Sequence, residues 1–98
     1  MSVVMHIAGT ATSDALPKIA RAFDALQPRL AAARALERSE LLVNHPERKV
    51  QFLLTFTGFE DAQVFMKDHA PALLAEFQGM VRDVSGPFFF AVEGGIAA

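Results

Sequence analysis

The sequence contains no cysteine, no tryptophan and no tyrosine. Without cysteine the chain can form no disulfide bond, thiolate nucleophile or zinc–thiolate site. Neither sign of charge is in large excess, because the chain has 9 Lys and Arg residues and 11 Asp and Glu residues, which gives a net charge of −2. Binding to a phosphate backbone needs a concentrated basic stripe, so we expect no nucleic-acid partner.

Long apolar runs and common catalytic motifs are missing as well. No run approaches the roughly 20 residues of a membrane span, and the first residues lack the pattern of a signal peptide. We therefore expect a soluble, cytoplasmic protein with no membrane partner. There is no GxGxxG, P-loop, HExxH or nucleophile-elbow motif. The histidines, His6, His45 and His69, lack HxH or HxxxH spacing, so we expect no metal site and no bound cofactor.

Hydrophobic periodicity divides residues 1–98 into six elements of a single domain. A first helix begins at Ser13 or Asp14, and Pro28 is expected to kink or end it near Gln27. A second helix is expected to bend at Pro71. The predicted strands are residues 2–11, 36–44, 49–57 and 81–92, with an irregularity at residues 86–87. The order predicts an α+β, ferredoxin-like βαββαβ fold, a four-stranded antiparallel sheet with two helices on one face.

Adjacent apolar residues make both faces of the predicted sheet apolar. They are Val3-Val4-Met5, Leu41-Leu42-Val43, Leu53-Leu54 and Phe88-Phe89-Phe90. A strand with one face in water instead alternates apolar and polar residues. Two helices can cover only one face, so we expect a second copy of the chain to cover the other and form a homodimer.

Two segments, ELLVNHPERKVQFLLTF and GFEDAQVFMKDHAPALLAEF, give the chain a family resemblance. Together with the doubly apolar sheet, they resemble the dimeric α/β barrel superfamily, and within it the antibiotic biosynthesis monooxygenase-like branch. The resemblance implies two sheets packed face to face across a dimer axis. It also implies oxidation of polycyclic aromatic compounds by dioxygen in an apolar pocket, without metal or flavin. Other branches degrade haem with a histidine of the second helix as iron ligand, and His69 is the positional counterpart.

His69 is the first candidate catalytic residue. Helical spacing places it on one stripe with Phe65, Leu73 and Phe77, facing the sheet. An imidazole there could act as a base near neutral pH, an iron ligand or a hydrogen-bond donor to a ligand. The alternative is a core histidine that bonds a backbone carbonyl freed by Pro71.

Asn44 and Arg38 are the two further candidates. Asn44 ends the second predicted strand, where its amide could reach a ligand or cap the following turn. Arg38 lies in a strand that otherwise contributes to buried faces, so it could stand at the pocket rim or form a salt bridge at the dimer seam.

Three functions fit this sequence. The first is a cofactor-independent monooxygenase, or a related enzyme, acting on a small aromatic or polyketide-like compound, with His69 as base or orienting group. The second is a non-catalytic dimeric module that binds a ligand or a structural partner. The third is a haem-binding or haem-degrading protein. The nine phenylalanines could line a pocket for a flat ligand or simply fill a core and an interface.

Overall fold

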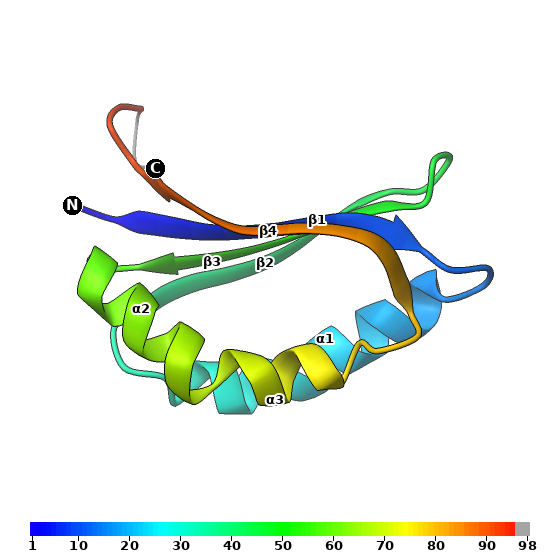
Figure 1. Ribbon diagram of the computed structural model, residues 1–98, viewed down its shortest axis with the longest axis horizontal. Coiled ribbons are helices and arrows are strands. Elements are labelled where there is room, and N and C mark those ends of the chain that lie inside the picture. Colours follow the sequence, from blue (N-terminus) through cyan, green and yellow to red (C-terminus); the bar gives the residue numbers. More distant parts are fainter. Residues whose placement is uncertain (96–98) are drawn as a thin grey trace.

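The computed structural model describes residues 1–95. Its four strands form one antiparallel sheet in the order β2-β3-β1-β4, and its helices all lie on one face of that sheet (Figure 1). The elements are β1 (Val3–Ala11), α1 (Leu16–Ala31), β2 (Leu36–Asn44), β3 (Lys49–Phe56), α2 (Phe59–Asp68), α3 (Ala70–Ala75) and β4 (Val81–Ala91). The predicted ferredoxin-like fold is confirmed, with the second helix divided in two.

The core lies between the sheet and the helices. Side chains of a strand point alternately to opposite faces, and in β1 every second residue is buried against the helices. The helices contribute stripes at three- and four-residue spacing. The buried strand residues include Val3, Met5, Ile7, Val50, Leu54 and Phe56, and the buried helix residues include Ile19, Phe23, Leu26, Leu30, Ala62 and Phe65.

The start of α1 differs from the prediction. Ser13 and Asp14 form a turn before the helix, and the N-cap is Ala15, which makes no side-chain capping hydrogen bond. A capping side chain accepts hydrogen bonds from backbone N–H groups of the first turn. Pro17 stands in that turn and has no N–H, so one of the donors that a cap would satisfy is missing.

Pro28 does not end α1, which continues to Ala31. Proline removes one backbone hydrogen bond, but the buried stripe runs past it to Leu30, and this packing holds the last turn in place. The Gln27 side chain also donates a hydrogen bond of 3.2 Å to the carbonyl of Phe23. The predicted end near Gln27 is therefore wrong, because tertiary packing outweighs the loss of one donor.

The second predicted helix breaks at His69, close to the expected bend at Pro71. His69 has φ −123° and ψ −34°, outside the helical region, and it both ends α2 and begins α3. Pro71 falls in the first turn of α3, where a missing N–H costs little. None of the helices in residues 1–95 is both long enough and apolar enough to cross a membrane.

The fourth strand lies at the sheet edge and is irregular, as predicted. Its register against β1 shifts between His6 and Ala8 and again between Ala8 and Thr10. Gly86 lies in the first irregularity with φ +101°, and a Cβ there would stand 2.5 Å from the carbonyl oxygen of His6. Only glycine fits this backbone conformation and this close approach.

Gly86→Ala is expected to lower the free energy of unfolding by about 1–3 kcal/mol, because a left-handed φ and a backbone clash coincide at this position. Urea denaturation followed by circular dichroism measures the change. Gly94→Ala is the matched control, since a Cβ at Gly94 would meet no atom of residues 1–95 within 4 Å and its φ is not left-handed. Equal destabilisation by the two substitutions would contradict the explanation.

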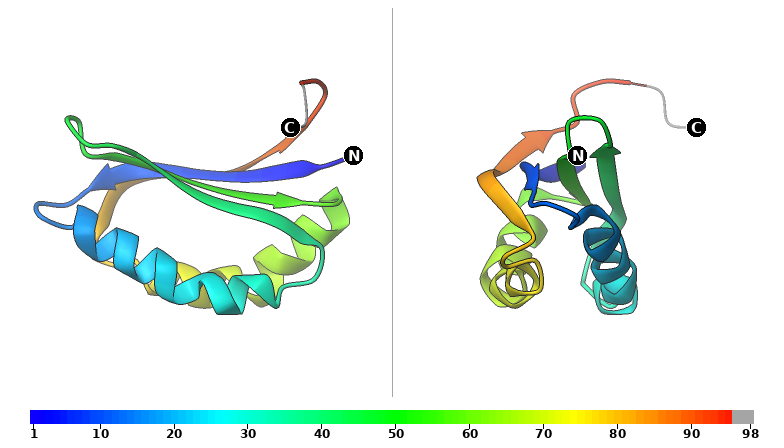
Figure 2. Two further views of the ribbon diagram at one scale, coloured as in Figure 1. Left: turned by 180° about the vertical axis from the view of Figure 1, so that it is seen from behind. Right: turned by 90° about the vertical axis from the view of Figure 1, so that its right-hand side faces the viewer.

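No helix of residues 1–95 covers the other face of the sheet (Figure 2). Direct pairing of His6 with Leu53 and Phe88, and of Val4 with Phe90, places these side chains on that same face. Phe88 is 51% exposed and Phe90 is 56% exposed. We call the surface formed by Val4, His6, Ala8, Leu53, Phe88 and Phe90 the open sheet face.

Candidate functional site

A cavity of about 400 Å³ lies between the sheet and the helices, and we call it the helix–sheet cavity. This volume falls within the range of small-molecule sites. Strands β1, β3 and β4, all three helices and the segment between α3 and β4 contribute to its wall. The lining residues are Met5, Ile7, Phe23, Leu26, Leu30, Phe52, Leu54, Phe65, Ala70, Leu73, Leu74, Ala75, Phe77, Gln78, Val81 and Val84.

Aromatic rings form a continuous part of this wall. The ring centroid of Phe52 lies 6.1 Å from that of Phe23 and 4.9 Å from that of Phe77. Phe65, from α2, supplies a further ring to the lining. Aromatic rings stack or meet edge to face at such distances, so a flat apolar ligand would find complementary partners here.

The cavity opens where its lining residues are exposed. Leu74 is 43% exposed and Val84 is 56% exposed, and Ala75 and Gln78 are exposed as well. These four residues, which we call the mouth, come from α3, from the turn after it and from the irregular part of β4. Ligand entry is therefore expected along the edge between α3 and β4.

The lining has no ionisable side chain, and Gln78 is its one polar residue. A general acid or base must come within hydrogen-bond reach of the proton that it moves. Within residues 1–95, the cavity wall therefore supplies no acid or base, and its contribution to a reaction would be binding, orientation and exclusion of water.

His69 is exposed and is absent from the lining. Its ring centroid lies 5.5 Å from that of Phe65, which does line the cavity. The predicted stripe is correct for Phe65, Leu73 and Phe77, which all line the cavity. His69 leaves the stripe because the helix breaks there, so the spacing counted along one continuous helix no longer gives its direction.

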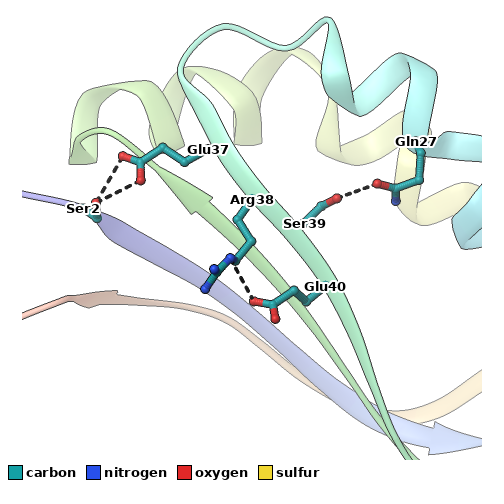
Figure 3. Close-up of polar contacts among 6 residues, drawn as sticks. All are labelled: Ser2, Gln27, Glu37, Arg38, Ser39 and Glu40. Atoms are coloured by element: carbon teal, nitrogen blue, oxygen red, sulfur yellow. Dashed lines mark hydrogen bonds and ion pairs between the residues drawn. The ribbon is translucent and has the colours of Figure 1, made fainter. Parts of the chain in front are cut away.

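Asn44 and Arg38 lie on other parts of the molecule. The Oδ1 atom of Asn44 accepts a hydrogen bond of 3.2 Å from the backbone N–H of Glu47, so the amide caps the turn between β2 and β3. Arg38 is exposed and forms an ion pair of 3.8 Å with Glu40 on the same strand (Figure 3). The three candidate catalytic residues are thus not brought together in one protomer.

Arg38 instead belongs to a polar group at one end of the open sheet face. Figure 3 shows Ser2, whose hydroxyl donates to Glu37 at 3.1 Å, together with the pair of Arg38 and Glu40. A hollow of about 760 Å³ lies here, lined by these residues, by Glu93 and by parts of β1 and β3. In contrast, Ser39 points to the helix layer, where its hydroxyl donates to Gln27 Oε1 at 2.7 Å.

No protein-family model matches the sequence, and no curated protein matches it either. Solved structures do. SnoaB, a cofactor-independent oxygenase from Streptomyces nogalater, gives a TM-score of 0.78 at 9% identity over 99% of this chain and 98% of the other. A candidate antibiotic biosynthesis monooxygenase from Nitrosomonas europaea gives 0.76 at 9% identity over 94% and 90%. MhuD, crystallised with two manganese protoporphyrin IX molecules per active site, gives 0.75 at 18% identity over 98% and 99%.

The chain shares the fold of these proteins. The likeness covers nearly the whole chain, so the resemblance seen in the sequence is confirmed at the level of the fold. Proteins with one fold can have different functions, which depend on the side chains of their sites, so the activity has to be argued from the cavity of this chain.

Gln78 is the polar lining residue that the sequence did not predict. It lies in the turn between α3 and β4, where no helical or strand period assigns a direction to a side chain. The one local signal is Gly79, whose φ of +82° marks the turn. Among residues 1–95, no group of three or more His, Asp or Glu side chains could hold a metal ion.

Proposed function

We propose that a homodimer of this protein binds a small aromatic or polyketide-like compound in the helix–sheet cavity and oxidises it as a cofactor-independent monooxygenase in the cytoplasm. The observation that carries the proposal is the cavity itself, about 400 Å³ with an almost wholly apolar, partly aromatic wall. A water molecule needs two to four polar partners, which this wall does not offer, so an apolar compound is the favoured occupant.

The proposed reaction needs no external reductant. A CH₂ group between aromatic rings loses two hydrogen atoms and gains one oxygen atom from dioxygen, and the second oxygen atom leaves as water. All the electrons come from the CH₂ group of the substrate, and its two hydrogen atoms leave with the second oxygen atom in the water. The cavity wall would hold the rings, exclude bulk water and keep the reactive carbon beside dioxygen.

His69, Asn44 and Arg38 stay predictions as catalytic residues. Of these, His69 lies against the lining residue Phe65. Because the lining contains no ionisable side chain, a second function, a non-catalytic module that binds the same class of compound, is also supported.

Haem fits the cavity poorly. Within residues 1–95 no histidine lines the wall to serve as iron ligand. The wall also lacks a lysine or arginine to pair with the two haem carboxylates. We derive no step through haem for this chain.

The proposed function predicts that anthrone, a tricyclic aromatic ketone with a reactive CH₂ group, stabilises the protein. At ten times its dissociation constant a ligand adds about 1.4 kcal/mol, which raises the Tm of a domain of this size by roughly 5 °C or more. Differential scanning fluorimetry measures the shift, and an oxygen electrode with product analysis measures conversion to anthraquinone above the rate without protein.

Ala70→Leu tests whether the cavity is the site. Ala70 is 2% exposed and lines the cavity, so a larger side chain fills part of it. We expect this variant to be more stable by about 0.5–2 kcal/mol and to lose the anthrone shift. Val64→Leu, on the exposed side of α2, is the control and should keep the shift. Binding without oxygen uptake would select the non-catalytic module, and absence of any Ala70-dependent binding would refute both functions.

A further inference from the structure

We infer that the helix–sheet cavity selects uncharged aromatic compounds carrying one hydroxyl or carbonyl group, and that Gln78 holds this group at the mouth. The inference rests on the proposed function and names the class of compound that the site accepts. It follows from three features of the site: the wall, the charges beside the mouth and the Gln78 amide.

The wall rejects charge. A carboxylate or ammonium group inside the cavity would lose its hydration and find no counter-ion, because no lining residue is ionisable. The innermost part of the wall includes Met5, Phe23 and Phe65, which are nearly fully buried. An ionised ligand could enter only by losing its charge.

The charges beside the mouth neutralise one another. Glu76, two residues before Gln78, forms an ion pair of 3.6 Å with Arg29 of α1. Arg82 and Asp83, next to the mouth residue Val84, form an ion pair of 3.4 Å. Each pair sums to zero charge, so neither pair offers a charged ligand an unpaired counter-ion.

Gln78 provides the one directional contact in the lining. Its amide carries two N–H donors and an oxygen acceptor, so it can accept from a phenol or donate to a ketone. Within residues 1–95 the amide makes no hydrogen bond to another residue, and it is exposed at the mouth. The neighbouring Phe77 turns its ring to Phe52 inside the cavity, at 4.9 Å between centroids. A bound compound would thus direct its rings inward and its polar group outward.

Competition against the fluorescent probe 1-aminoanthracene tests this inference with three matched compounds: naphthalene, 2-naphthol and 2-naphthoate. At neutral pH the first two are uncharged and the third is an anion. We expect 2-naphthol to bind about five- to tenfold more tightly than naphthalene, the effect of one hydrogen bond. We expect 2-naphthoate to bind at least about 100-fold more weakly than 2-naphthol, because its charge would be buried without a partner.

Variants assign the selectivity to Gln78. Gln78→Leu should bring the affinity for 2-naphthol down to that for naphthalene and leave naphthalene unchanged. Gln63→Leu, on the exposed side of α2, is the matched control and should keep the preference. Equal binding of 2-naphthoate and 2-naphthol, or a preference that persists in Gln78→Leu, would overturn this inference alone. If none of the compounds displaces the probe, or if Ala70→Leu does not abolish the displacement, both this inference and the proposed function fail.

Discussion

Phe90→Glu is expected to convert the proposed homodimer into a monomer that stays folded. Phe90 is 56% exposed in the single chain, so a charged side chain there costs the protomer little. In a dimer formed through the open sheet face, the same carboxylate would lose its hydration, and within its own protomer only the ring of His6 is placed beside it. A buried charge without a full counter-ion costs about 3–5 kcal/mol, which raises the dimer dissociation constant at least about 100-fold.

The open sheet face is the reason for placing the partner there. Phe90 lies opposite Val4 on β1, and its ring centroid is 6.1 Å from that of His6. Phe88, also more than half exposed, lies opposite His6. A contiguous exposed apolar patch of this kind marks an interaction surface in a stable protein. In the proposed homodimer, a second copy related by a two-fold axis would present the same patch, so that each copy would cover the patch of the other.

Val64→Glu is the control for this prediction. Val64 is 54% exposed, close to the value of Phe90, but it lies on α2, away from the open sheet face. Both substitutions add one negative charge, so they change the net charge equally. Sedimentation equilibrium over a dilution series measures the dissociation constants. A wild-type monomer, or equal weakening by both variants, would refute the dimer through this face.

The fold could be predicted from the sequence because its signals are local. Adjacent apolar residues such as Phe88, Phe89 and Phe90 must point to opposite faces of a strand, whatever the tertiary structure. The structure places Phe89 opposite Met5 on the helix side, and Phe88 and Phe90 on the open sheet face. The predicted strand bounds hold to within one residue at each end. The local rules fail where packing outweighs them, as at Pro28.

The site is harder to predict, because it depends on where elements end. In a continuous helix the side chain of His69 would point toward the sheet. The helix breaks at His69 itself, so helical spacing no longer predicts where this side chain points. The sequence leaves Asn44 open between turn cap and ligand contact, and its bond to Glu47 places it in the turn. Gln78 lies where no period applies, and only the three-dimensional arrangement shows that it meets the cavity.

Phe56→Ala is expected to destabilise the fold more than any of the other substitutions proposed above. Phe56 is fully buried, and its ring centroid lies 5.2 Å from that of Phe65 on α2. It also pairs with Val3 and Leu36 on the two neighbouring strands. Removing a buried phenylalanine ring costs about 3–5 kcal/mol, a large share of the roughly 5–15 kcal/mol typical of a domain.

The consequence of Phe56→Ala extends to the cavity. Phe65 packs against Phe56 and also lines the helix–sheet cavity. The ring of Phe56, which is not itself part of the lining, therefore supports a residue of the cavity wall. Thermal unfolding should show a Tm lower by more than about 10 °C, and the anthrone shift should shrink because the wall loses its support. Phe59→Ala is the matched control. Phe59, the first residue of α2, is 50% exposed and contacts Phe89 of β4. Loss of its ring should cost about 1 kcal/mol of stability and leave anthrone binding intact. Equal losses in the two variants would contradict the role of Phe56 as the support of the cavity wall.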